Sequence, residues 1–274
     1  VLEAKIVEDK EKGLTPFFIC ANVGTTSTLA IDPVGTIADI AQRHNLWLHV
    51  DAAYAGTAAI CEEFRYVNNG AEKADSYTFK TIGDVNLRLH VFGSNGDDRE
   101  LKPGVIFFFG GGLMGGSITH FQSQARALSQ KGMIAVLADY RVKRRHDTGP
   151  KEAISDAKDA VSWLREHAAK LNLDPNKLVV GGGSSGGYLA ASTATVSDQS
   201  ISRIASKYSS IPNALALFNP ALGNRHPRTG HSLSPYHSLS DSSVPTFIVH
   251  GEADDVVPFK SAQAYCDKLK SLDE

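Results

Sequence analysis

The pattern of apolar and polar positions along this chain predicts an alternation of strands and helices. Apolar runs typical of strands occur at 16–23, 46–50, 86–92, 104–110, 133–140, 177–183, 213–220 and 245–251. Helical spacing of apolar residues, or a helix-forming composition, occurs at 2–12, 34–44, 119–132, 150–171 and from about 259 onward. This alternation predicts an α/β fold, in which helices cover both faces of a mostly parallel sheet.

The pattern changes near residue 80, which indicates two parts of different origin. Residues 1–79 show a βαβ pattern in which Asp32 is expected to cap a helix that has Pro33 at its first position. A new series then starts with 86–92, whose strict alternation predicts a two-faced antiparallel strand. No linker rich in Pro, Gly or Ser separates the parts, and we expect domains at 1–79 and 80–274.

The composition is that of an ordinary globular protein. The 274 residues carry a formal net charge of −2 and are 42% hydrophobic, which gives no reason to expect nucleic acid or a membrane as a partner. The basic run at 141–146 is interpreted as a solvated loop. Cys20, Cys61 and Cys266 lie far apart without a CxxC motif, so neither a disulfide framework nor a metal site is expected.

Targeting signals are not apparent in the sequence. No apolar stretch reaches the roughly 18 residues of a membrane span, and residues 1–13 have no hydrophobic signal core. The default expectation is a cytoplasmic protein, but the sequence starts with Val1 rather than Met, so a leader can precede it. The sequence does not indicate the oligomeric state.

A serine lies in a glycine-rich turn between a predicted strand and a predicted helix. Residues 183–187 read GSSGG and fit G-x-S-x-G, the motif that holds a nucleophilic serine in a strained, exposed turn. In this alignment Ser185 is the candidate nucleophile and Ser184 occupies the variable position. The alternatives are a phosphate-binding loop, which would need a lysine and another glycine spacing, or simple tight packing.

Two further segments fit the same chemistry. The glycine triplet in FFFGGGLMGG (107–116) can turn amide N–H groups toward an oxyanion, for which we select Gly111 and Gly112, completed by Gly186. In HGEADDVVP (250–258) an acid follows a strand, as does the residue that orients a triad histidine, and Asp254 is preferred to Asp255. A flexible loop and an acidic surface turn are the respective alternatives.

Residues from about 80 onward resemble α/β-hydrolase esterases related to the hormone-sensitive-lipase family, of the acetyl-esterase or carbohydrate-esterase type. The likeness rests on the three motifs above and on ADYRV (138–142), 156–187 and 244–258. It implies hydrolysis of short acyl esters of small molecules without a cofactor. Leu113 stands where the family commonly has Trp, so the shape of the substrate pocket is not implied.

The resemblance also implies a catalytic histidine, which the family carries after the acid. All ten histidines precede Asp254. We therefore expect a hydrolase that ends before its base and lacks the last strand of its sheet, with impaired activity. His120 and His146 are weak candidates to substitute for the base, whereas His250 is expected to pack at the end of its strand.

Residues 1–79 resemble a different family, the pyridoxal-phosphate-dependent group II decarboxylases of aromatic amino acids. The likeness lies in TPFFICANVGTTSTLAIDP, NLWLHVDAAYAG and CEEFRYVNNGAEKADSYTF. It implies that Asp51 pairs with the cofactor's pyridine nitrogen and that Thr25 and Ala53 line its site. Lys80 comes too early to form the Schiff base and Gly83 takes the lysine's place, so covalent cofactor binding is not expected.

Three hypotheses follow from these two resemblances. The first is a serine esterase that lacks its histidine and is preceded by a foreign fragment. The second is a remnant of a pyridoxal-phosphate-dependent decarboxylase. The third is a chimeric product in which neither part is catalytic.

Overall fold

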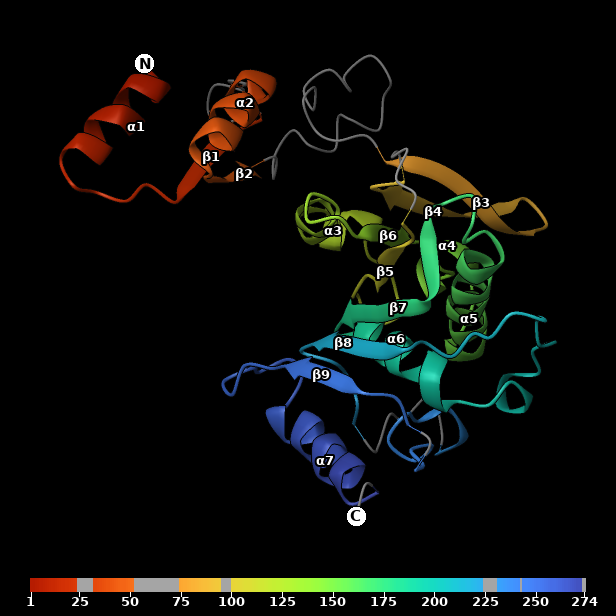
Figure 1. The fold of residues 1–274 in the computed structure, drawn as a ribbon. Coiled ribbons are helices and arrows are strands. Elements are labelled where there is room, and N and C mark those ends of the chain that lie inside the picture. Colours follow the sequence, from red (N-terminus) through yellow and green to blue (C-terminus); the bar gives the residue numbers. More distant parts are fainter. Residues whose placement is uncertain (24–31, 52–73, 95–99, 224–230, 242, 273–274) are drawn as a thin grey trace. The chain divides into compact units, whose positions relative to one another are not determined.

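A computed structural model describes residues 1–23, 32–51, 74–94, 100–223, 231–241 and 243–272. The chain forms two compact units, Val1–Lys73 and Ala74–Glu274. None of the described helices is long and apolar enough to cross a membrane. Figure 1 shows the elements of each unit.

The first unit contains the predicted βαβ arrangement. Its elements are α1 (Leu2–Glu11), β1 (Phe18–Asn22), α2 (Val34–His44) and β2 (Trp47–Asp51). The two strands are parallel and pair Phe18 with Trp47. Alternate residues such as Ile19 pack against Ile6 of α1 and Ile40 of α2, whereas Phe18 and Trp47 on the other face are exposed. Among the described residues of this unit, the helices α1 and α2 therefore cover the face of the sheet that carries Ile19.

The predicted helix cap at Asp32 is wrong. Pro33, not Asp32, is the residue that precedes α2, and no side chain caps the helix. The Asp32 carboxylate instead accepts a hydrogen bond from the Asn22 backbone N–H at 2.7 Å. Asp32 therefore connects the segment that precedes α2 to Asn22, the last residue of β1.

The second unit is built on a seven-stranded sheet with the order β3-β4-β6-β5-β7-β8-β9. Its strands are β3 (Asp75–Ile82), β4 (Val85–Phe92), β5 (Lys102–Phe108), β6 (Ile134–Ala138), β7 (Leu173–Gly183), β8 (Ala214–Phe218) and β9 (Thr246–Val249). Strands β3 and β4 are antiparallel to their neighbours and the other pairs are parallel. The helices are α3 (Gln122–Ser129), α4 (Lys143–His146), α5 (Pro150–Glu166), α6 (Ser185–Thr195) and α7 (Phe259–Lys270), with short 3₁₀ turns at Ile118–Phe121, Gln199–Ile201 and His231–Leu233.

Helices cover both faces of this sheet, as the periodicity predicted. Phe107 of β5 packs in a cluster with Ala125 of α3, while the adjacent Phe108 belongs to the larger core that contains residues of α5 and α6. Successive side chains of a strand point to opposite faces, so a continuous apolar strand requires cover on both sides. Figure 1 shows α5 and α6 along the β5–β7 region.

The junction between the two units lies earlier in the chain than the change of sequence pattern. The expected boundary after residue 79 falls inside β3, whereas the compact units divide between Lys73 and Ala74. Strand β3 pairs along its length with β4. The ring of its Tyr77 packs on Trp163 of α5, with the two ring centroids 5.5 Å apart. The strand therefore belongs to the second unit.

Strand β9 lies at the opposite end of the sheet from β3. Within the described residues β9 is the last strand, and it pairs only with β8. Phe247 of β9 is 62% exposed and Val249 is also exposed, whereas Ile248 between them packs against the core. One face of β9 is thus uncovered.

Candidate active site

The turn between β7 and α6 holds Ser184 in an unusual backbone conformation. Ser184 has φ 53° and ψ −120°, a combination that costs energy for any residue with a side chain. Its N–H donates to Phe218 O at 3.1 Å, and its carbonyl accepts from Tyr188 N and Ala221 N at 3.1 and 3.0 Å. These three bonds hold the strained turn, which presents a partly exposed Ser184 at the end of β7.

The structure places the two adjacent serines in different conformations and environments. Ser185 is the first residue of α6, is only 5% exposed, and its Oγ has no hydrogen-bond partner among the described residues. The nearby Tyr140 hydroxyl donates to Phe109 O at 2.7 Å. The motif G-x-S-x-G also fits 182–186 with Ser184 as its serine, and this second alignment is the one whose serine has the strained geometry of a nucleophile elbow.

Glycine at position 186 allows helix α6 to approach the sheet closely. A Cβ added to Gly186 would lie 2.1 Å from Phe108 O and 2.5 Å from Phe109 O. Gly182 meets Gly186 in the same way, since its added Cβ would lie 2.5 Å from the Gly186 carbonyl carbon. The glycines around the serine are therefore required by packing as well as by the turn.

The glycine triplet after β5 lies against the serine turn. A Cβ on Gly110 would lie 3.3 Å from Ser184 Cβ. Gly111 and Gly112 have φ angles of +136° and +63°, and in the described part of the chain their N–H groups donate no hydrogen bond. The carbonyl of Gly111 accepts a hydrogen bond from Met114 N at 3.0 Å, so the chain turns between Gly111 and Met114.

These positions define a candidate oxyanion site with one change from the sequence-based selection. With Ser184 as nucleophile, the amide that follows it belongs to Ser185 rather than Gly186, and it lies in the first turn of α6, where helical N–H groups have no intrahelical acceptor. Gly111 and Gly112 remain the candidates for the other two donors.

Asp254 is held in a defined orientation after β9, whereas Asp255 is exposed. Asp254 Oδ1 accepts hydrogen bonds from the backbone N–H groups of Val256 and Val257, both at 2.9 Å, and Asp254 Oδ2 accepts one from Asn219 Nδ2. The Val257 N–H, then Asn219 and Val256, hold the pKa of Asp254 below its usual value. The carboxylate is therefore ionised and rigid at neutral pH.

No described histidine hydrogen-bonds to the Ser184 side chain. His250 Nε2 lies 2.7 Å from Val257 O and 3.6 Å from Asp254 Oδ2, which agrees with its predicted packing at the strand end. His120 Nδ1 accepts from Gly110 N at 3.1 Å, so a neutral His120 carries its proton on Nε2. His146 Nδ1 is occupied in the same way by Val142 N. The lone pair on Nδ1 of His120 and that on Nδ1 of His146 are thus both used in these hydrogen bonds, so neither histidine is free to take the proton of Ser184.

The described residues do not fit pyridoxal phosphate. Thr25 and Ala53 lie outside them, while Asp51 ends β2 with an exposed side chain. Lys80 is in the second unit, where its ammonium group binds Asp156 and Asp159. The described residues also contain no cluster of His, Cys, Asp or Glu that could hold a metal ion.

Comparisons with known proteins divide the chain in a similar way. Residues 1–82 match the family described as pyridoxal-dependent decarboxylase conserved domain, and residues 89–217 match the family described as BD-FAE. The first segment is 54% identical over 78 residues to L-tyrosine/L-DOPA decarboxylase 2 of Lophophora williamsii, and 52% identical over 79 residues to phenylacetaldehyde synthase of a Rosa hybrid cultivar. These matches cover 28% and 29% of this chain but only 15% and 16% of the two relatives.

Solved structures match the second unit. Esterase 2 of the planctomycete Thermogutta terrifontis, with propionate bound, is 34% identical with a TM-score of 0.69, over 73% of this chain and 79% of that chain. The same esterase phosphorylated by paraoxon is 36% identical with a TM-score of 0.68, over 74% and 79% of the respective chains. The matched family at 1–82 extends through β3, although β3 folds with the second unit.

Proposed function

Because the chain belongs, through its second unit, to the α/β-hydrolase esterases, we propose that it is a serine ester hydrolase with Ser184 as nucleophile. The observation that carries this proposal is the strained conformation of Ser184 beside Gly110, the first residue of the glycine triplet, whose next two amides donate no hydrogen bond in the described part of the chain. A strained residue costs free energy, and such cost is concentrated at functional sites. Simple packing would not require a serine there.

In this proposal Ser184 Oγ attacks the acyl carbon of the ester, its proton passes to a solvent water, and the carbonyl oxygen becomes an oxyanion. Collapse of this intermediate breaks the bond to the alcohol, which leaves with a proton from solvent, and a second water then hydrolyses the acyl-Ser184 ester. The amides of Gly111, Gly112 and Ser185 donate to the oxyanion, which stabilises the tetrahedral intermediate. Asp254 is the acid that would orient a base and stabilise its protonated form. The substrate class is small-molecule esters with short acyl groups, such as acetyl esters; the propionate- and butyrate-bound structures of Thermogutta terrifontis esterase 2 support short chains.

The absence of a described base at Ser184 limits the expected rate. In serine hydrolases the loss of the triad histidine lowers kcat on the order of 10⁶-fold. We therefore expect slow hydrolysis of activated esters by the 274-residue chain. Asp254 Oδ1 accepts two amide bonds and its Oδ2 accepts one bond from Asn219, so Oδ2 keeps an acceptor position that could orient a base.

The decisive measurement is hydrolysis of p-nitrophenyl acetate by the unaltered chain, by Ser184→Ala and by Ser185→Ala. Ser184→Ala is expected to reduce the rate to the background. Ser185→Ala keeps the backbone amide and is expected to stay within a few-fold of the unaltered chain. Equal rates in Ser184→Ala and the unaltered chain would overturn the esterase proposal, and loss of activity in Ser185→Ala alone would return the nucleophile to Ser185.

The likeness to decarboxylases supports a second candidate, a remnant of a pyridoxal-phosphate-dependent enzyme. Lys80 is tied to two carboxylates and Gly83 takes the place of the Schiff-base lysine, so the protein is expected to form no lysine adduct with added pyridoxal phosphate. Titration with the cofactor, followed by visible absorbance, measures this. A new absorbance band that is lost in Lys80→Met would favour the remnant.

A further inference from the structure

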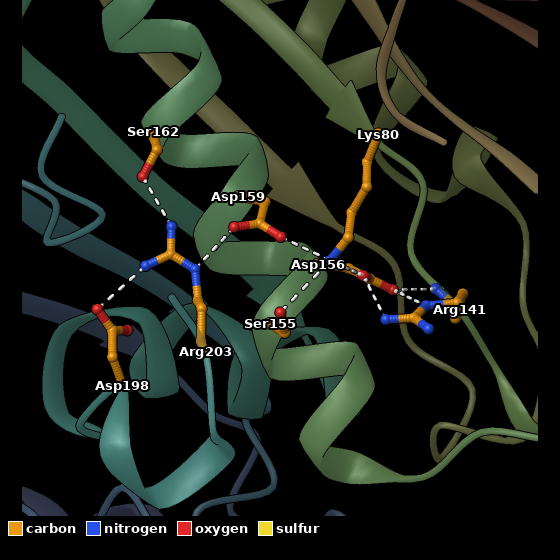
Figure 2. Close-up of polar contacts among 8 residues, drawn as sticks. All are labelled: Lys80, Arg141, Ser155, Asp156, Asp159, Ser162, Asp198 and Arg203. Atoms are coloured by element: carbon orange, nitrogen blue, oxygen red, sulfur yellow. Dashed lines mark hydrogen bonds and ion pairs between the residues drawn. The ribbon is translucent and has the colours of Figure 1, made fainter. Parts of the chain in front are cut away.

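Asp156, in the middle of α5, is a fully buried carboxylate that binds two cations (Figure 2). Its Oδ2 accepts from the backbone N–H and from Nε of Arg141 at 3.0 and 2.8 Å. Its Oδ1 accepts from Arg141 Nη2 at 2.9 Å and from Lys80 Nζ at 2.7 Å. Three of these four bonds come from one residue, and one of them comes from the backbone, so Asp156 fixes the main chain at position 141.

The segment 140–144 in turn holds the glycine loop 109–114 at both ends. At one end, the Tyr140 hydroxyl donates to Phe109 O at 2.7 Å, and the two rings stack with centroids 4.2 Å apart. At the other end, Lys143 N donates to Leu113 O at 2.9 Å and Arg144 N to Met114 O at 3.0 Å.

Leu113 needs this support because it has φ +60° although it carries a side chain. The glycines between the two ends have few bonds of their own. Gly110 donates to His120, and in the described structure Gly111 and Gly112 donate to nothing. A glycine segment has many accessible conformations, so its N–H groups converge on one point only if its ends are fixed.

We propose that Asp156, acting through Arg141, is a positioning residue that holds the glycine loop with the amides of Gly111 and Gly112 free to bind an oxyanion. The proposal rests on the oxyanion role proposed above. Asp156 contacts no substrate atom in this arrangement; it acts through the backbone of 140–144. Lys80 supports it by adding a second cation to the same carboxylate.

The same helix provides a matched control. Asp159 lies three residues further along α5 and accepts from Lys80 Nζ at 2.5 Å and from Arg203 Nε at 2.7 Å. Figure 2 shows that it shares Lys80 with Asp156 but has no bond with Arg141. Asp156→Asn and Asp159→Asn therefore remove the same charge from the same helix, and only the first removes the hold on 141.

The test compares these two variants in two measurements on the full chain. Asp156→Asn is expected to lower kcat for p-nitrophenyl acetate about 10- to 100-fold with KM changed less than about twofold, because misplaced oxyanion donors raise the barrier more than they weaken ester binding. With ¹⁵N-glycine labelling, the amide resonances of Gly111 and Gly112 are expected to shift or broaden in Asp156→Asn. Asp159→Asn is expected to leave both the resonances and kcat close to those of the unaltered chain.

The two measurements separate the proposals. If the unaltered chain shows no Ser184-dependent hydrolysis, the proposed function fails, and the glycine resonances still decide whether Asp156 positions the loop. If Asp156→Asn does not fold, Arg141→Lys replaces it, since it keeps the charge and the backbone bond but loses the two-point contact; a smaller shift of the same resonances is expected. Glycine resonances that respond equally to Asp156→Asn and Asp159→Asn, or to neither, would overturn the positioning role.

Discussion

At the scale of single residues, Gly186 has the smallest tolerance for a side chain among the glycines next to Ser184. Alanine normally stabilises a helix relative to glycine by about 0.5–1 kcal/mol. Here the opposite is expected, because the added Cβ would lie 2.1 Å from Phe108 O. Gly186→Ala should lower the free energy of unfolding by about 2–3 kcal/mol, measured by urea denaturation.

Gly83 is the control for this prediction. It has a φ of +55° but no atom within 4 Å of an added Cβ, so Gly83→Ala should cost only about 1–2 kcal/mol of backbone strain. A larger loss in Gly83→Ala than in Gly186→Ala would contradict the packing argument.

His90 on β4 gives the second unit a pH dependence. Burial, followed by Arg88, lowers the pKa of His90 below its usual value of 6.5, and Asp139 partly opposes this shift. The unfolded chain therefore binds the proton more readily than the folded chain. The stability that neutral His90 contributes is complete above about pH 6.5 and is lost as the pH falls toward the lowered pKa.

Urea denaturation at about pH 7.5 and about pH 5.5 measures this effect. The unaltered chain is expected to lose more stability between the two pH values than His90→Gln, which cannot titrate. An equal loss in both proteins would assign the pH dependence to other groups.

At the scale of elements, Lys80 connects β3 to α5. Its ammonium group binds two carboxylates on the helix, one of them fully buried, and also reaches Ser155 Oγ at 3.3 Å. A hydrogen bond to a charged group contributes about 1.5–3 kcal/mol to stability. Lys80→Met, which removes the bonds to the two carboxylates, should therefore lower the free energy of unfolding by about that amount.

The matched comparison is the pair Lys143–Asp147, whose side chains are well exposed. Solvent screens such a pair, and Lys143→Met should cost less than about 1 kcal/mol. Equal losses in Lys80→Met and Lys143→Met would show that burial of Asp156 does not strengthen the Lys80 contact.

At the scale of the whole molecule, the position of the junction predicts which part folds alone. A chain that starts at Ala74 keeps β3 and is expected to unfold at the urea concentration at which the second unit unfolds in the full chain. A chain that starts at Asp84 loses the ladder between β3 and β4, the Tyr77–Trp163 contact and Lys80. It should unfold at lower urea. If the chains that start at Ala74 and at Asp84 unfold at the same urea concentration, β3 does not belong to the cooperative unit.

The class of fold and most of the elements follow from the amino-acid sequence alone. Periods of two and of three to four residues reflect which side chains face a core, and that pattern is local. It predicted the βαβ arrangement at 1–51 and the mostly parallel sheet with helices on both faces. Motifs and family likeness also located the serine turn, the glycine triplet and Asp254 within a few residues.

Only the tertiary structure decided between neighbours that the sequence leaves equivalent. Ser184 and Ser185 both fit the motif, and they differ in backbone conformation. The conformation of Ser184 is held by a hydrogen bond that its N–H donates to Phe218 O and by two that its carbonyl accepts from Tyr188 N and Ala221 N. The place of β3 was missed because its pairing with β4 and the contact of Lys80 with α5 join distant positions in the chain. Local patterns carry no information about such long-range partners, which is why Arg141 and Asp156 became visible only in the folded molecule.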